Sequence, residues 1–137
     1  MEFFFLDLLQ IVAIHQDQLD RYGGERGLRD IELLNSAIAM PQAGFGDEYL
    51  HKGVFEMAAA YLFHIVKNHA FLDGNKRTGT AAALVFLELH GYKVPVSDDE
   101  LVDLTLRVVN NEIGKPEVAE FFQARSVPSD PPTAPSE

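Results

Sequence analysis

Residues 78–89 constrain the fold of this chain most, because they carry small or apolar side chains almost all round, with Glu88 as their sole charge. The pattern predicts a helix over residues 75–90, which Gly91 ends. A helix that is apolar on every face must be covered on every face. It therefore belongs at the centre of a bundle, and the rest of the chain has to supply the helices around it.

Five further helices are predicted from apolar residues that recur at the helical period. Their expected ranges are residues 7–22, 31–40, 54–68, 98–110 and 116–125. Two of them begin with a capping pair, Asp7 with Gln10 and Ser97 with Glu100. The sequence thus predicts an all-α bundle of about six helices, formed by residues 1–125.

Three segments fall outside this helical pattern. Residues 41–53 contain Pro41 and three glycines, which predicts a loop or short flap between two helices. Residues 94–96, Val-Pro-Val, are too short and too proline-broken for a central strand. Residues 126–137 hold four of the seven prolines together with serines and acids, and we expect this tail to be disordered.

The overall composition excludes several classes of protein. Because the chain has no cysteine, it has no disulfide scaffold, thiolate metal site or cysteine nucleophile. The net charge of -10 disfavours nucleic-acid binding, since neutralisation of phosphates supplies most of that affinity. The longest apolar run, residues 81–87, is far shorter than the roughly 18 residues of a membrane-spanning helix, and the N-terminus lacks the basic region of a secretory signal. We therefore expect a soluble, cytoplasmic protein without a direct nucleic-acid or membrane partner.

The segment His-Ala-Phe-Leu-Asp-Gly-Asn-Lys-Arg-Thr, residues 69–78, concentrates reactive groups at the start of the predicted central helix. A helix N-terminus attracts anions; Gly74 would allow a close approach, and Lys76 and Arg77 add two cations. Asp73 would repel a phosphate there unless Mg²⁺ lay between them. His69 suits a general base, because free histidine side chains change their protonation state near neutral pH. Together these residue types predict phosphate transfer.

Each of these residues also has a purely structural interpretation. Taken alone, His69 is more often a capping or core histidine, and Asp73 is a good helix N-cap. Lys76 and Arg77 would be a solvated first turn, although cations oppose the helix dipole there. His64 lies five residues before His69, which is not the spacing of a metal-binding pair on a helix. The remaining histidines are expected to be surface or core residues: His15, His51 and His90.

Residues 69–78 resemble the signature motif of the Fic/Doc superfamily, and closely that of its Doc (death-on-curing) branch, the toxins of bacterial toxin–antitoxin pairs. The similarity extends upstream to residues 15–24, to the turn at residues 27–30 and to residues 34–41. It covers roughly residues 11–122, which is most of the chain. The resemblance implies a Fic/Doc-like helical fold, with ATP and Mg²⁺ as cofactors.

Fic proteins transfer AMP from ATP to a hydroxyl of a target protein. By this resemblance His69 is the base, Asp73 the metal ligand and Phe71 the buried anchor of the loop. The phosphate-binding residues implied by the resemblance are Gly74, Asn75 and Arg77. The sequence leaves open whether Arg26 and Arg29 reach the site.

The chain departs from the usual Fic pattern at three positions. Ala70 stands in place of proline, Lys76 in place of a second glycine, and Thr80 in place of a second arginine. The Doc branch shares such departures; it is known as a kinase that phosphorylates a threonine of elongation factor Tu and arrests translation. Lys76 favours this interpretation physically, because its bulk and charge crowd the cradle and would turn the nucleotide so that its γ-phosphate faces the target.

Three functional interpretations therefore stay open. The leading one is a Doc-type kinase toxin acting on elongation factor Tu; the others are an adenylyltransferase of the same fold and a catalytically silent, antitoxin-binding regulator. The intact His69, Asp73, Asn75 and Arg77 argue against the silent regulator. The sequence has no Ser/Thr-x-x-x-Glu-Gly/Asn inhibitory element, so we expect restraint to come from another chain, a cognate antitoxin.

Overall fold

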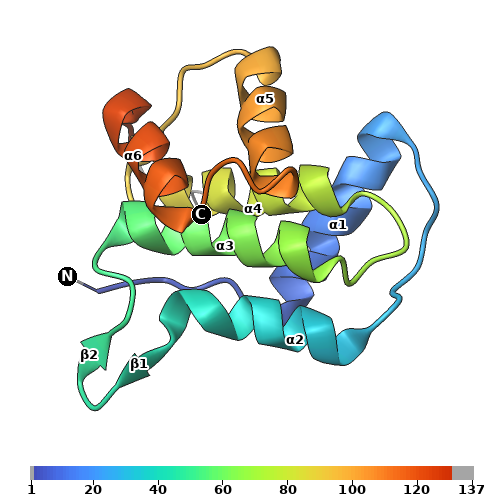
Figure 1. Cartoon of the computed structure of the whole chain (residues 1–137), viewed down its shortest axis with the longest axis horizontal. Helices are drawn as coiled ribbons and strands as arrows, with labels where there is room; N and C mark the ends of the chain where they lie inside the picture. Colours follow the sequence, from blue (N-terminus) through green and yellow to red (C-terminus); the bar gives the residue numbers. More distant parts are fainter. Residues whose placement is uncertain (1, 131–137) are drawn as a thin grey trace, which may run out of the picture.

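Helices α3 (Val54–Asn68) and α4 (Asn75–Leu89) lie side by side in the middle of the molecule (Figure 1). The computed structural model describes residues 2–130, and in this part the chain forms six α-helices and two small two-stranded sheets. Helix α4 contacts α1, α3 and α5. Of its residues, Lys76 and Glu88 alone are exposed. The prediction of an all-α bundle with this helix at its centre is therefore confirmed, although one side of α4 is only half-buried.

The backbones of α3 and α4 approach each other closely at Gly79. A Cβ atom on Gly79 would lie 2.8 Å from Val66 Cγ2 and 3.0 Å from the carbonyl oxygen of Leu62. Both distances are shorter than ordinary van der Waals contact, so no residue larger than glycine fits without movement of α3. The small side chain thus sets the separation of the two central helices.

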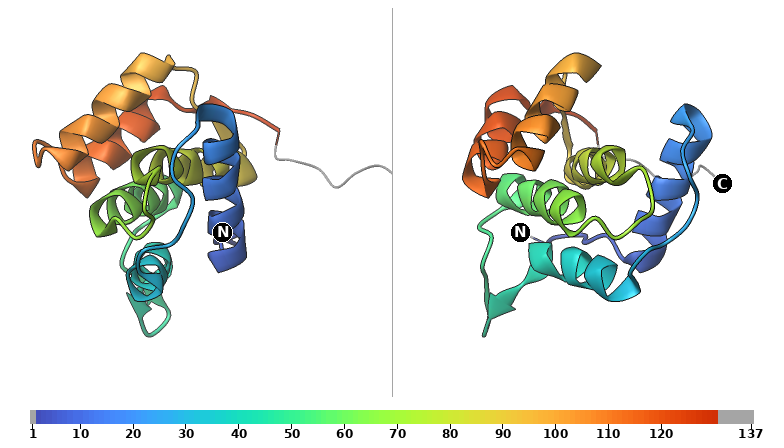
Figure 2. Two further views of the ribbon diagram at one scale, coloured as in Figure 1. Left: turned by 90° about the vertical axis from the view of Figure 1, so that its right-hand side faces the viewer. Right: turned by 45° about the vertical axis from the view of Figure 1, so that its right-hand side comes forward.

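The other four helices surround this pair. Helix α2 (Ile31–Ala39) lies on one side of it, while α5 (Asp98–Val109) and α6 (Lys115–Arg125) lie on the opposite side; α1 (Leu8–Tyr22) crosses near the start of α4 (Figures 1 and 2). The capping pairs predicted at the starts of α1 and α5 are both formed. Among the helices of residues 2–130, none combines the length and apolarity that crossing a bilayer requires.

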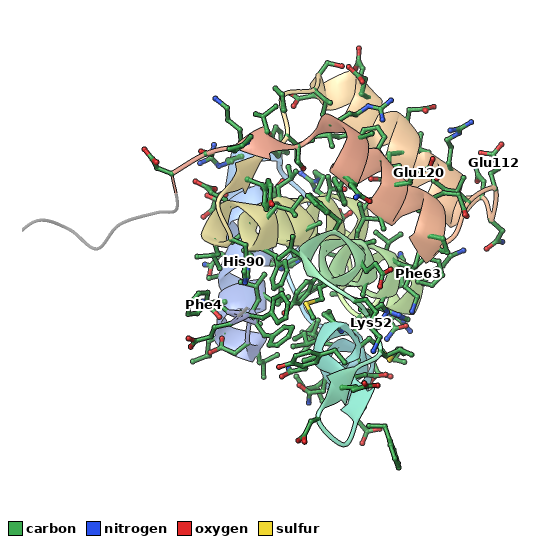
Figure 3. All side chains as sticks on the ribbon, turned by 90° about the vertical axis from the view of Figure 1, so that its left-hand side faces the viewer. Phe4, Lys52, Phe63, His90, Glu112 and Glu120 are labelled. Atoms are coloured by element: carbon green, nitrogen blue, oxygen red, sulfur yellow. The ribbon has the colours of Figure 1, made fainter. Side chains whose placement is uncertain are left out.

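Aromatic side chains close the C-terminal end of α4. The His90 ring lies 4.3 Å from that of Phe86, which is fully buried. His90 Nδ1 donates to the carbonyl of Phe86 (2.7 Å), and its Nε2 accepts from the amide of Phe4 (2.9 Å), so the N-terminal segment is fixed against this end (Figure 3). Tyr61 on α3 accepts from the amide of Leu6 (2.8 Å), and burial raises the pKa of Tyr61 to about 12.

The predicted flap at residues 41–53 is a hairpin. After a 3₁₀ turn, Met40–Gln42, strands β1 (Gly44–Phe45) and β2 (Glu48–Tyr49) pair antiparallel and project from the bundle (Figure 1). The Phe45 side chain at its tip is 94% exposed. The flap therefore presents an aromatic ring to the surroundings of the bundle.

A second strand pair fixes the start of the C-terminal segment. Strand β3 (Tyr92–Lys93) pairs with β4 (Val127–Pro128), and Ser129 donates to the carbonyl of Gly91 (2.8 Å). The tail predicted to be disordered from residue 126 is thus a paired strand at its start. The rest of that prediction, residues 131–137, lies outside the described residues.

Candidate active site

His69 ends α3 in an unusual backbone conformation. Its φ of 49° and ψ of 49° lie in the left-handed region, which costs a residue with a side chain about 1–2 kcal/mol. The residue is exposed, whereas the next one, Ala70, is buried. The left-handed turn lets the chain leave α3 abruptly and enter the loop of residues 70–74 with the imidazole at the surface.

Asn75 at the start of α4 holds this loop closed. Its side-chain Oδ1 accepts from the amide of Phe71 (3.0 Å), and its Nδ2 donates to the carbonyl of Phe71 (2.9 Å). Both residues are buried, with 4% of Asn75 and 2% of Phe71 exposed. Because both the Oδ1 and the Nδ2 of this buried amide bond to Phe71, the side chain of Asn75 fixes the loop.

His15 on α1 contacts the same loop through its ring. Its ring stacks on Phe71 with centroids 3.7 Å apart and an angle of 7° between the planes. Its Nε2 donates to the carbonyl of Asp73 (2.8 Å). The ring is buried, and burial lowers its pKa in spite of the bond to Asp73, which acts in the opposite direction. His15 is therefore neutral at pH 7 and anchors the loop that carries the predicted metal ligand.

The carboxylate of Asp73 is exposed but already ordered by the backbone. Oδ2 accepts from the amide of Glu25 (3.0 Å) and Oδ1 from the amide of Gly74 (2.8 Å). These two hydrogen bonds, with smaller contributions from Arg77 and Lys76, lower the pKa of Asp73. The carboxylate is thus ionised at neutral pH, and each oxygen keeps lone pairs that point away from the protein.

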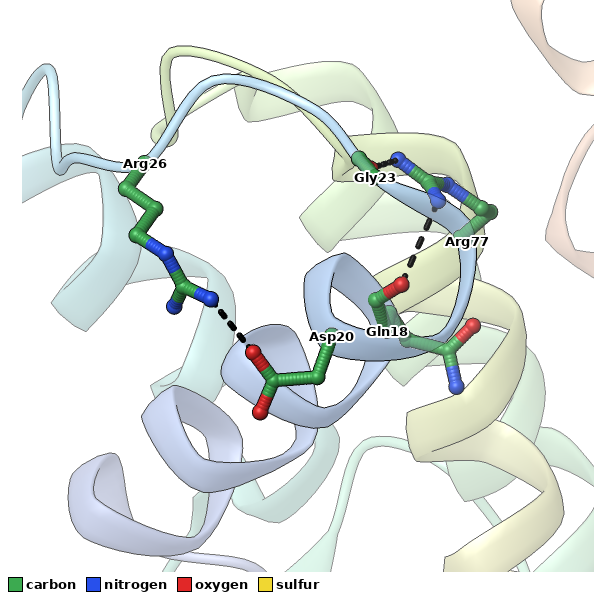
Figure 4. A network of polar contacts seen from close by, with 5 residues as sticks. All are labelled: Gln18, Asp20, Gly23, Arg26 and Arg77. Atoms are coloured by element: carbon green, nitrogen blue, oxygen red, sulfur yellow. Dashed lines mark hydrogen bonds and ion pairs between the residues drawn. The ribbon is translucent and has the colours of Figure 1, made fainter.

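Arg77 lies in the first turn of α4 and reaches across to the end of α1. Its Nη2 donates to the carbonyl of Gly23 (2.8 Å) and its Nη1 to that of Gln18 (3.3 Å) (Figure 4). The guanidinium therefore satisfies carbonyls at a helix C-terminus, a favourable place for a cation. Gly24 passes close by: a Cβ atom there would lie 2.9 Å from Asp73 Oδ2, which explains the glycine at this position.

The first turn of α4, with its backbone N–H groups, begins two residues after Asp73. Gly74 is the N-cap residue in a left-handed conformation (φ 78°), and within residues 2–130 no side chain caps this helix. A Cβ atom at Gly74 would lie 3.2 Å from Leu19 Cδ2, which is tighter than ordinary contact. Lys76 is exposed on this turn. An uncapped helix start with two nearby cations is a suitable anion site.

Residues 27–30, just before α2, also form hydrogen bonds with the loop. The amides of Arg29 and Asp30 both donate to the carbonyl of Ala70 (2.7 and 3.0 Å), and Leu72 donates to the carbonyl of Gly27 (3.0 Å). The Arg29 side chain bonds to the last carbonyls of α3. Arg26, in contrast, pairs with Asp20 away from the motif (Figure 4).

An apolar groove of about 410 Å³ continues from the start of α4. Tyr22 of α1, Lys76 and Leu84 of α4, and several residues of α5 line it. Val102 and Leu106 on α5 are exposed in this groove. The anion site of the first turn therefore opens into an uncovered apolar surface.

The spacing of His64 and His69 argues against a metal-binding pair, and His64 instead belongs to a separate polar cluster. His64 Nε2 accepts from Lys115 Nζ (3.0 Å), which also donates to His51 Nε2 (3.1 Å). Burial lowers the pKa of His64 to about 4, and the charge of Lys115 acts in the same direction. Burial likewise lowers the pKa values of His51 and Lys115. This cluster joins α3, α6 and the base of the flap and is separate from the motif loop.

The predicted motif residues therefore lie in one loop and the helix turn after it. The sequence pattern does not reveal which of their side chains are exposed and which bond to the backbone. His69, Asp73 and Lys76 are exposed, whereas the side chains of Asn75 and Arg77 bond to the backbone. Sequence reasoning missed His15 as a support of the loop; it left open whether Arg29 reaches the site, and the Arg29 side chain bonds to the carbonyl of His69. A signal for His15 was present: Ile11, His15 and Leu19 recur every four residues and form the buried stripe of α1.

Known proteins are similar to this chain in sequence. The model of the Fic/DOC family matches residues 5–87. The chain is 35% identical over 114 residues to "Protein kinase doc" of Escherichia phage P1, a match that covers 83% of this chain and 89% of that protein. It is 41% identical over 78 residues to "Toxin Doc" of Mycolicibacterium smegmatis, which covers 57% of this chain and 60% of that protein. The chain belongs to the Fic/DOC family.

Proposed function

We propose that the chain is a Doc-type toxin that transfers the γ-phosphoryl group of ATP to a hydroxyl of elongation factor Tu and so arrests translation. One observation carries this proposal: an exposed histidine, His69, begins the short loop that leads into an uncapped helix start, where Asp73 and Lys76 are also exposed. Base, carboxylate and anion site are the groups that phosphoryl transfer requires. The relatives named as a kinase and as a toxin support the same function.

The donor set at Asp73 fits Mg²⁺. The carboxylate is exposed, ionised and held by two backbone amides, and Mg²⁺ is commonly bound by one carboxylate together with phosphate oxygens. Within residues 2–130 no cluster of three acidic or histidine side chains offers a fuller metal cage. When bound, Mg²⁺ would neutralise charge between the phosphates and Asp73. The N–H groups of the first turn, with Lys76 and Arg77, would hold the phosphates.

His69 would accept the proton of the target hydroxyl. The imidazole stands at the surface, where a hydroxyl of another protein reaches it, and the rigid loop keeps it at a fixed position relative to the helix start. A base held in this way raises the nucleophilicity of the hydroxyl only where the phosphorus atom is aligned with it. The flap, with its exposed Phe45, gives the target a surface to contact beside the bundle.

The position of Lys76 favours phosphoryl over adenylyl transfer. Its stem and ammonium stand in the first turn of α4, where a glycine would leave room for the diphosphate. To test this, the protein is incubated with elongation factor Tu and with ATP labelled at either the α- or the γ-phosphate. We expect γ-label on the target and ADP as the product. Robust α-label would overturn the kinase assignment in favour of an adenylyltransferase, and absence of both labels would favour a silent regulator.

We also propose that the apolar groove beside Lys76 receives an amphipathic segment of a cognate antitoxin. The groove is lined largely by apolar side chains, and Val102 and Leu106 are exposed there. Because the protein carries a net charge of -10, capture should depend on apolar burial, with modest salt sensitivity and a negative heat-capacity change. Val102→Glu should abolish capture of the co-expressed antitoxin, whereas Val109→Glu, at an exposed position outside the groove lining, should not. Equal capture by both variants would contradict this site.

A further inference from the structure

The left-handed conformation of His69 needs a contact that holds it. The residue has φ and ψ near 49°, a combination that residues with side chains rarely adopt, and it directly follows the last turn of α3. Its side chain is exposed and has no hydrogen bond among the described residues. The fixed point of His69 is therefore its backbone carbonyl.

Arg29 binds this carbonyl with two donors. Nε lies 2.9 Å and Nη2 2.6 Å from the carbonyl oxygen of His69, and Nη2 also lies 3.4 Å from that of Asn68. The guanidinium thus forms a fork on the last carbonyls of α3, where a positive charge is favourable. A rotation of the His69 peptide out of the left-handed region would turn its carbonyl away from both donors.

We infer that Arg29 is a positioning residue for His69: by holding its carbonyl, the guanidinium keeps the imidazole aligned with the start of α4. The inference rests on the proposed role of His69 as base. It concerns orientation alone, because the loop itself has separate attachments. The backbone amides of Arg29 and Asp30 hold Ala70, and Asn75 holds Phe71, whatever side chain stands at position 29.

This separation allows a sharp test with Arg29→Ala. We expect kcat for phosphoryl transfer to fall by about 10–100-fold, since small misplacements of a catalytic group have effects of that size. The KM for ATP should stay within about twofold, because Asp73 and the start of α4 are untouched. Guanidinium ion added at millimolar concentration should restore part of kcat, whereas methylammonium should not. Arg29→Lys should rescue little, because an ammonium lacks the planar fork.

Arg21→Gln is the matched control. Arg21 is also an exposed arginine on this side of the molecule, and its side chain pairs with Asp17 within α1. We expect its kcat, KM and response to guanidinium to equal those of the wild type. A purely structural role of Arg29 would lower ATP binding together with kcat and would leave no specific rescue by guanidinium; that outcome overturns the inference.

A readout independent of activity separates this inference from the proposed function. A positive φ brings the amide and α protons of one residue close together, so His69 should give a strong intraresidue NOE in the wild type. Arg29→Ala should weaken it, and guanidinium ion should restore it. An unchanged NOE in Arg29→Ala overturns the inference even if the enzyme is active; a wild type without transferase activity defeats the proposed function and leaves the NOE test valid. Should Arg29→Ala not fold, Arg29→Lys provides the same comparison.

Discussion

At its N-terminal end α4 meets a loop whose backbone is held by polar side chains, whereas at its C-terminal end it meets a cluster of aromatic rings. In the loop, Asn75, His15 and Arg29 each bond to backbone groups of residues 69–73. At the other end Phe86 is fully buried, and His90 contacts it ring to ring. Both ends have hydrogen bonds and buried rings, but directional bonds dominate where the candidate site lies and aromatic burial dominates at the other end.

The two ends show what apolar burial and hydrogen bonds each contribute to a structure. Burial of apolar surface contributes free energy but is not directional. A hydrogen bond contributes roughly 0.5–1.5 kcal/mol net, but it fixes an atom relative to its partner. A loop that must hold a histidine, a carboxylate and free N–H groups in one arrangement requires the second kind of support. We therefore expect activity and stability to respond separately to substitutions at the two ends of α4.

The largest effect is expected for the base. His69→Ala should lower phosphoryl transfer by roughly 10²–10⁴-fold, the range for removal of a general base. Its free energy of unfolding should change little, because the side chain is exposed. Transfer assays and urea denaturation of the same preparation measure both quantities. Near-normal transfer by the folded variant would remove His69 from the mechanism.

The opposite pattern is expected at the aromatic end. Phe86→Ala should lower the free energy of unfolding by about 3–5 kcal/mol, since it leaves a cavity beneath His90 and Tyr61. The fraction that remains folded should transfer phosphate at the normal rate per molecule. Phe86→Leu, which retains more volume, is the control and should be milder. A specific activity reduced at full folding would show that the two ends of α4 are coupled.

Asn75, at the start of α4, is expected to affect both stability and activity. Asn75→Ala leaves the buried N–H and C=O of Phe71 without partners, which should cost about 1–3 kcal/mol of stability. Transfer should also fall, because the loop between His69 and Asp73 is released. Asn75→Asp keeps an acceptor for the Phe71 amide and should lie between the two. Loss of ATP binding without loss of stability would instead favour the direct phosphate contact predicted from sequence.

The smallest effect is expected for the cluster of His51, His64 and Lys115, which lies outside the motif loop. Because burial and Lys115 lower the pKa of His64 from 6.5 to about 4, the unfolded chain takes up its proton first as pH falls. Stability should therefore be complete above pH 6.5 and decline down to about pH 4. With allowance for partial exposure of His64, the loss is about 1–2 kcal/mol. Denaturation at several pH values measures it; His64→Gln should reduce the slope, and an identical slope would assign the acid sensitivity to other groups.

The helices were predictable because each carries its own signal in a short window. The apolar period and the capping pairs Asp7–Gln10 and Ser97–Glu100 need no information from elsewhere in the chain. The strand formed by Val127–Pro128 was not predictable in this way, because its partner, Tyr92–Lys93, lies far away in the sequence. Local composition there indicates a tail, while pairing with a distant segment decides the structure.

The site was predictable in its residues but not in how they are used. The motif predicts His69 as the base and Asp73 as the metal ligand, and both side chains are exposed. It does not reveal that the side chains of Asn75 and Arg77 bond to the protein's own backbone. A sequence shows which polar groups are present. Which of them remain free for a ligand depends on the carbonyls and amides that folding brings near.

The close contact at Gly79 has a consequence for how such a site can change. Because a Cβ atom at Gly79 would meet Val66 and the carbonyl of Leu62, α3 and α4 pack at a separation that only glycine allows, and a larger residue there should shift His69 relative to the start of α4. The packing of α3 against α4 thus sets how far apart the end of α3 and the start of α4 lie, the two places that the proposed function uses. Adaptation to another target is then left to parts outside these two helices, above all the projecting hairpin of residues 44–49, which can vary in sequence without disturbing the reacting groups.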